Sequence, residues 1–133
     1  MTNKTLRVLL DEAESALGIY KNPDLSELRP ILNEVLTAAG FGSPGNDLIW
    51  RISESSYSEN KYFQIETEYY IRNCLMRDTF YLPSFIVDSP DPIVAAKKHR
   101  KETAITKAQQ DIAKAEQDLI DANDRLLSAY RLP

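Results

Sequence analysis

Residues 105–129 read ITKAQQDIAKAEQDLIDANDRLLSA and carry a repeat of seven residues. In each of four repeats a large aliphatic residue is followed three residues later by an alanine. This alternation of spacings places the repeated residues on one face of a helix, as in a coiled coil. The residues of this seam are Ile105, Ala108, Ile112, Ala115, Leu119, Ala122, Leu126 and Ala129. Because alanine lets two helix axes approach to about 8 Å, the seam predicts close packing against another helix.

The helix that carries the seam is predicted to begin at Asp91 and to end at Tyr130. Asp91 can accept a hydrogen bond from a backbone N–H of the first turn, and Pro92 fits the first helical position. Near the C-terminus, Ile120, Leu127 and Tyr130 add a second apolar row beside the seam. The seam therefore needs a partner. The sequence leaves three alternatives open: the N-terminal part of the same chain, a second copy of the chain, or a helix of another protein.

Two amphipathic helices are predicted in the N-terminal part of the chain. The first covers residues 4–20, where leucines and alanines follow a period of 3.6 residues. The second runs from about Pro30 to Ala39, because Pro30 disfavours the helical conformation at the residue before it, Arg29. Gly40 is suited to the left-handed conformation that ends many helices. The break at residues 22–24 is short, so the two helices are expected to form an antiparallel hairpin.

The middle of the chain favours a small antiparallel sheet. Residues 48–53 and 62–71 alternate apolar with polar side chains, and many of them are aromatic or β-branched, which is typical of strands with one buried face. In the first of these strands the alternation places Trp50 and Ile52 on the same face. Residues 61–76 also fit a helical pattern, and the sequence leaves that alternative open.

A third strand is predicted over residues 79–87, after a turn at residues 76–78, with Pro83 restricting it to the edge of the sheet. The predicted fold class is therefore α+β, with an N-terminal helical hairpin, a small antiparallel β-meander and a long C-terminal helix with a coiled-coil-like seam. Residues 1–90 are expected to form a compact body. Residues 91–133 form the helix, either within the same domain or as an oligomerisation arm.

The composition is typical of a soluble globular protein. The chain has 133 residues, of which 43% are hydrophobic and 27% charged, and its net charge is −4. No apolar run approaches the ~18 residues needed to cross a bilayer, so we expect a cytoplasmic protein without a membrane partner. Cys74 and His99 are the single cysteine and the single histidine, which excludes an internal disulfide and the usual thiolate and imidazole metal sites. No cofactor is expected.

One face of the second predicted strand carries polar and aromatic residues that could bind a protein. These residues are Tyr62, Gln64, Glu66, Glu68 and Tyr70. Tyrosine supplies contact area at a low entropic cost, which favours a polar protein-binding surface. The carboxylates of Glu66 and Glu68 would stand roughly 7 Å apart, a separation that leaves a small hydrolase acting on a sugar as an alternative.

A basic turn in the long helix, residues 97–101, is a second candidate surface. Its basic residues are Lys97, Lys98, Arg100 and Lys101. They could hold an anion, so a nucleic-acid or nucleotide-binding module is a further alternative. The charge distribution disfavours general nucleic-acid binding, because residues 1–90 hold 8 basic and 13 acidic residues, while residues 91–133 hold 8 and 7.

These patterns predict a small, non-enzymatic binding protein that acts as a regulator or inhibitor of a protein partner. The sequence shows no grouping typical of nucleophilic catalysis, and the predicted body is acidic. Inhibitors of the immunity, antitoxin or phage counter-defence kind have a similar build. The long helix is expected to make the protein a homodimer.

Overall fold

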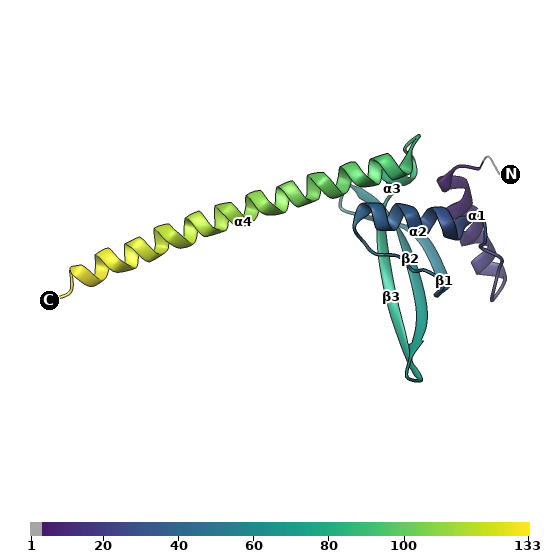
Figure 1. The fold of residues 1–133 in the computed structure, drawn as a ribbon, viewed down its shortest axis with the longest axis horizontal. Coiled ribbons are helices and arrows are strands. Elements are labelled where there is room, and N and C mark those ends of the chain that lie inside the picture. The colour runs from purple at the N-terminus through teal and green to yellow at the C-terminus, as the bar shows by residue number, and fades with distance from the viewer. Residues whose placement is uncertain (1–3) are drawn as a thin grey trace. The chain divides into compact units, whose positions relative to one another are not determined.

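The computed structural model describes residues 4–133 of the chain. Two helices precede a three-stranded antiparallel sheet, and a short helix and a long helix follow it (Figure 1). The elements are α1 (Leu6–Ile19), α2 (Leu28–Ala39), β1 (Leu48–Tyr57), β2 (Asn60–Ile71), β3 (Cys74–Pro83), α3 (Ser84–Val87) and α4 (Pro92–Tyr130). The α+β prediction is confirmed. The chain falls into two units, unit 1 ending at Lys98 and unit 2 covering His99–Pro133.

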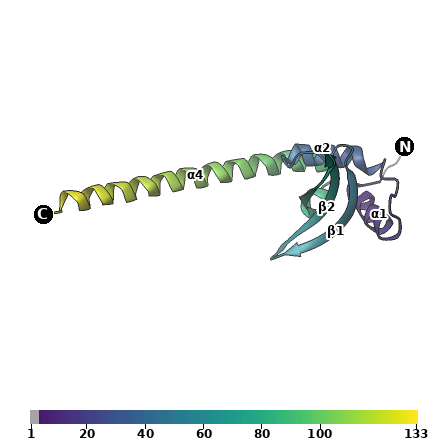
Figure 2. The same cartoon turned by 90° about the horizontal axis from the view of Figure 1, so that it is seen from below.

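Helix α1 begins where a side chain satisfies one of its free backbone donors. The hydroxyl oxygen of Thr5 accepts a hydrogen bond from the backbone N–H of Val8 at 3.3 Å. One face of the helix is buried, and its buried residues are Leu6, Leu9, Leu10 and Ala13. This face contacts β1, so α1 lies beside the first strand (Figure 2).

Helix α2 begins at Leu28, two residues before the predicted start at Pro30. The carboxylate of Asp24 accepts a hydrogen bond from the backbone N–H of Ser26, and this turn leads directly into the helix. Pro30 is tolerated because it stands in the first turn, where backbone N–H groups have no partner inside the helix. Gly40 ends α2 with a φ of 87°, as predicted.

The sheet is a meander with strand order β1-β2-β3. Residues 61–71 are strand, which decides against the helical alternative for most of the ambiguous segment, and β3 accounts for its end. Phe63, Ile65 and Thr67 of β2 are buried and point toward the helices as the alternation predicted. The core of unit 1 therefore lies between this face of the sheet and α1, α2 and α3.

A β-bulge in β1 changes which residues of that strand are buried. The pairing with β2 shifts between Ile49 and Arg51, so Ile49 and Ile52 are both buried although they are three residues apart. The prediction that Trp50 and Ile52 share a face is wrong for this reason. Trp50 is half-buried instead, and an arginine from β3 contacts its ring.

The third strand begins earlier and ends earlier than predicted. Arg72 and Asn73, with φ of 50° and 66°, form a two-residue turn, whereas the turn was predicted at residues 76–78. Two consecutive residues with positive φ match the twist of a hairpin. Residues 84–87 are helical because Ile86 and Val87 are both buried, and consecutive side chains of a strand would point to opposite faces.

Helix α4 runs without interruption over 39 residues (Figures 1 and 2). The carboxylate of Asp91 accepts a hydrogen bond from the backbone N–H of Val94 at 3.2 Å, which confirms the predicted start. Ala96 is its buried residue and belongs to the core of unit 1. Over residues 4–133, no helix is both long enough and apolar enough to cross a membrane.

Candidate functional site

Three segments of unit 1 are joined by the guanidinium group of Arg7. Its Nε and Nη2 donate to the two carboxylate oxygens of Asp88, at 2.7 and 2.9 Å, and its Nη1 donates to Glu54 at 3.0 Å. The guanidinium also stands 4.8 Å from the ring centre of Phe63, a buried residue of β2. Helix α1, strand β1 and the segment after α3 are therefore held together at one point.

The charges of this cluster stabilise one another. The hydrogen bonds from Arg7 hold the pKa values of Glu54 and Asp88 below their ordinary values, and those same bonds raise the pKa of Arg7. The hydroxyl group of Ser84 donates a further bond to Glu54 at 2.8 Å. Each carboxylate oxygen of Glu54 and Asp88 accepts a hydrogen bond from Arg7 or Ser84, so the cluster has a structural role in fixing the fold of unit 1.

The candidate protein-binding residues of β2 share the face of the sheet that points away from the core, here called the outer face. Their side chains are Tyr62, Gln64, Glu66 and Glu68, which are half-buried, and Tyr70, which is exposed. The neighbouring strands contribute cross-strand partners to the same face, since Arg51 pairs with Glu66 and Arg77 pairs with Glu68. The structure thus brings the predicted set together and adds arginines from both sides.

Both carboxylates of the outer face are engaged by these arginines. Arg51 Nη1 lies 3.6 Å from a carboxylate oxygen of Glu66, and Gln64 donates to the other oxygen at 3.2 Å. Arg77 Nε donates to Glu68 at 3.0 Å while its guanidinium lies over the ring of Trp50, 5.3 Å from its centre. Ion pairs between neighbouring strands contribute modestly to the stability of a sheet surface.

The tip of the β2–β3 hairpin is a two-stranded arm, which we define as residues 69–76. The pairing of β1 with β2 ends at Leu48 and Glu68, while β2 and β3 continue side by side to the turn (Figure 1). Apolar side chains on both faces of this arm are exposed. They are Tyr70 (72%), Ile71 (51%), Leu75 (43%) and Met76 (41%).

Tyr70 is the one residue of this arm that belongs to the predicted binding residues. Ile71, Leu75 and Met76 were missed because the turn was placed at residues 76–78, which put them on no common element. The available signal was a pair of apolar runs on both sides of Arg72 and Asn73, two residues at which a hairpin turn can close. A turn predicted at Arg72 and Asn73 would have placed these side chains on two paired strands.

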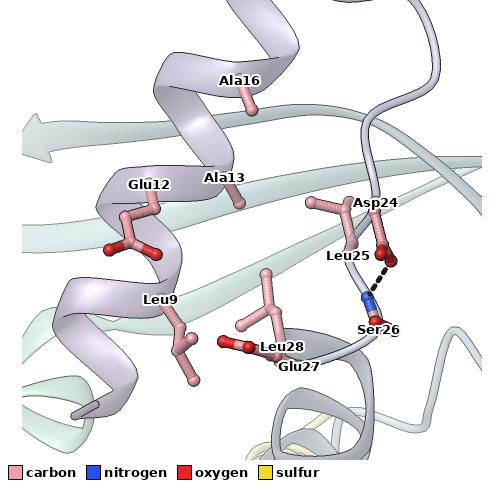
Figure 3. Close-up of a pocket in the computed structure, with 9 residues that line it drawn as sticks. All are labelled: Leu9, Glu12, Ala13, Ala16, Asp24, Leu25, Ser26, Glu27 and Leu28. Atoms are coloured by element: carbon pink, nitrogen blue, oxygen red, sulfur yellow. Dashed lines mark hydrogen bonds between the residues drawn. The ribbon is translucent and has the colours of Figure 1, made fainter. Parts of the chain in front are cut away.

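A pocket of about 260 Å³ lies between α1 and the segment that leads into α2 (Figure 3). Leu9 and Ala13 of α1 face Leu25 and Leu28 across it, and carboxylates stand at its rim. One of these, Glu12, accepts a hydrogen bond from Lys4 at 2.9 Å. The dashed bond in Figure 3 joins Asp24 and Ser26, and it holds the pKa of Asp24 below its ordinary value. The carboxylates of Glu12 and Asp24 at the rim are therefore engaged in hydrogen bonds with neighbouring residues.

The remaining predicted residues lie on α4. Lys97, Lys98, Arg100 and Lys101 are exposed, and the i, i+3, i+4 spacing of Lys97, Arg100 and Lys101 places these three on one side of the helix. The large seam residues are also exposed, with Ile105 at 48%, Ile112 at 59%, Leu119 at 63% and Leu126 at 53%. Within the described part of the chain, no three His, Cys, Asp or Glu side chains are grouped as metal ligands.

Comparison with models of protein families, with curated proteins and with solved structures found no match to this chain.

Proposed function

We propose that this chain is a non-enzymatic protein-binding protein, a regulator or inhibitor that acts in the cytoplasm and contacts its protein partner through the β2–β3 arm. The observation that carries this proposal is the exposure of four large apolar side chains on the arm. Apolar residues that stand together on a protein surface mark an interaction site more often than residues scattered singly. Inhibitors of the immunity, antitoxin or phage counter-defence kind are the class of protein that this build fits.

The composition of the arm supports a protein as the occupant. Its eight residues include two tyrosines and a methionine but only one charged residue, Arg72. Aromatic residues and methionine are enriched at the centre of protein interfaces, while lysine, glutamate and aspartate are depleted there. Two strands joined by a tight turn also present these side chains at fixed positions, which lowers the entropic cost of binding.

The outer face supplies a polar surface that continues from the arm along β2. Tyr62 and Gln64 stand on the same strand as Tyr70, and Tyr81 of β3 pairs with Gln64 across the sheet. An apolar centre with a polar, hydrogen-bonding rim is the usual anatomy of a protein interface. The arginine contacts of Glu66 and Glu68 favour this use over acid-base catalysis on a sugar.

The proposal includes self-association of the chain through α4. The large residues of the seam are about half exposed or more, although their spacing is that of a helix made to be covered. A homodimer would present two arms to its partners, which raises apparent affinity when both can engage at once.

The test compares partner capture by the full chain with capture by two variants. The arm variant is Tyr70→Ser/Leu75→Ser, and the matched control is Tyr20→Ser, which changes a tyrosine that is 63% exposed at the C-terminal end of α1. Loss of two interface anchors is expected to weaken binding of a captured protein by at least ~30-fold. The control is expected to bind as the wild type does, and circular dichroism checks that each variant is folded.

A third variant, Tyr62→Ala, separates the outer face from the arm. It is expected to weaken binding by about threefold to tenfold, as rim residues do. Unchanged capture by the arm variant would contradict the proposal, since it would place the binding surface elsewhere.

A further inference from the structure

We infer that α4 pairs with α4 of a second copy of this chain in antiparallel orientation, in one register centred close to Gln117. This inference rests on the self-association included in the proposed function and specifies its geometry. It starts from the seam, whose four large residues are 48 to 63% exposed within this chain. Every residue from 101 to 133 is exposed as well, so the seam is fully accessible to a partner.

The alternation of large and small residues selects the orientation. In a parallel pair each seam position faces its own copy, so large residues would face large residues and alanines would face alanines. Such layers require two different distances between the helix axes, and the alanine layers would be left underpacked. In an antiparallel pair each large position faces an alanine position. All layers then contain the same side-chain volume and suit one short interhelical distance.

One register satisfies all seam positions without overhang. Its facing pairs are Ile105 with Ala129, Ile112 with Ala122, Leu119 with Ala115 and Leu126 with Ala108 of the second copy. The two-fold axis that relates the copies passes near residue 117, so each pair occurs twice and the eight layers form a closed, symmetric contact. A shift of seven residues in either direction would leave large residues uncovered at the ends.

The charges beside the seam favour the same orientation. In the antiparallel register Asp111 of each copy lies beside Arg125 of the other, whereas in a parallel pair Asp111 would lie beside Glu116 of the other copy. Near the two-fold axis Glu116 and Asp118 approach their own copies, which opposes pairing. Lys114, four residues before Asp118 on the same helix, partly offsets that repulsion. The packing of the layers therefore provides most of the preference, and the charges reinforce it.

Cross-linking of single-cysteine variants tests the orientation. Each variant is made in the full chain with Cys74→Ser, so that the introduced cysteine is the only one. Glu116→Cys places a thiol next to its own copy in the antiparallel pair, and a short bis-maleimide is expected to yield a covalent dimer. Leu126→Cys is expected to yield none, because 18 residues separate the two thiols along the axis, roughly 27 Å. Gln117→Cys, on the side of the helix away from the seam, is the matched control.

The reverse pattern, with a dimer from Leu126→Cys and none from Glu116→Cys, would overturn the inference because it indicates a parallel pair. Light scattering across a dilution series provides the second measurement. Wild-type chain is expected to be dimeric, and Leu119→Lys/Leu126→Lys is expected to raise the dissociation constant by at least about 100-fold. A monomeric wild type, or a dimer that this substitution leaves unchanged, would also overturn it.

The two proposals fail separately in these experiments. The arm variant Tyr70→Ser/Leu75→Ser leaves α4 intact and is expected to keep the mass of the wild type. A chain that dimerises as described but captures no protein through the arm would refute only the partner-binding function. A chain that captures a partner as a monomer would refute the helix pairing together with the self-association, and would leave the partner-binding function of the arm in place.

Discussion

Arg7 contacts three separate segments of the chain, and the amphipathic pattern of α1 does not predict these contacts. Its guanidinium is bonded to Glu54 in β1 and to Asp88 after α3, and it stands over the ring of Phe63. The side chain of Arg7 is 28% exposed and that of Glu54 30% exposed, so water screens these interactions only in part. The cluster fixes the return of the chain from the sheet to the start of α4.

Replacement of Arg7 by methionine is expected to lower the free energy of unfolding at neutral pH by about 1 to 2 kcal/mol, because two carboxylates lose a charged hydrogen-bond donor. The loss is modest because one of these carboxylates, Asp88, is half exposed and screened by water. Urea unfolding followed by circular dichroism measures this change. The control is Arg72→Met, which alters an exposed arginine of the hairpin turn. An equal loss of stability in both variants would show that the Arg7 contacts contribute nothing specific.

The same variant is expected to change how stability depends on pH. Glu54 and Asp88 have pKa values in the folded state below the ordinary values of 4.5 and 3.8. Their contribution is therefore fully present above about pH 5 and is lost as the pH falls through the ordinary values and below. Wild-type protein should lose stability toward about pH 3 more steeply than Arg7→Met, in which this linkage is absent. Parallel curves would contradict the role of the cluster.

At the scale of elements, the hairpin arm shows how a short turn creates a surface. Arg72 and Asn73 both adopt positive φ, a conformation that costs arginine free energy because its Cβ crowds the backbone. The pairs Tyr70 with Leu75 and Ile71 with Cys74 extend the hairpin past the end of β1. The arm therefore depends on a turn whose residues are not the most favourable for it.

The substitution Arg72→Asn/Asn73→Gly is expected to make the arm more stable. Asparagine followed by glycine is the most favourable sequence for a two-residue turn with two positive φ values, and the gain is roughly 1 kcal/mol. Hydrogen exchange of the amides in residues 69–76 should slow by about fivefold for that gain. Amides at the opposite turn, residues 57–60, are the internal control and should exchange at unchanged rates. Faster exchange in the arm would contradict the assigned turn.

At the scale of the molecule, the core belongs to unit 1. The buried apolar residues of the described chain all precede Lys98, and Ala96 is the last of them. Unit 2 is a helix whose residues after 100 are exposed. Folding of the sheet and its helices should therefore be independent of the segment that carries the seam, and the two functions assigned to the chain reside on separable parts.

A chain ending at Lys98 is expected to fold and to unfold cooperatively. Its free energy of unfolding should lie within about 1 kcal/mol of that of full-length Leu119→Lys/Leu126→Lys, because none of the buried core is removed. The comparison uses that variant so that dimer formation does not add to the stability of the longer chain. Urea unfolding at equal concentration is the measurement. A truncated chain without a sheet signal in circular dichroism would contradict the assignment.

The order and type of most elements could be predicted from the sequence. The leucines of α1, the glycine that ends α2, the alternation around Phe63 and the cap at Asp91 are local patterns, and each depends on residues only a few positions apart. The seam of α4 is local in the same sense. Such patterns suffice because helix and strand periodicities are properties of short stretches of chain.

Other features were decided by contacts between residues far apart in the chain. The bulge at Ile49 follows from pairing with β2, the helical turn at residues 84–87 follows from the need to bury Ile86 and Val87 together, and the cluster of Arg7 joins residues up to 81 positions apart. The exposed arm appears only when the lengths of β1 and β2 are compared. Local side-chain spacing defines the periodic elements and the seam. Which side chains remain uncovered depends on the tertiary structure, because burial is set by all the neighbours that the fold brings together.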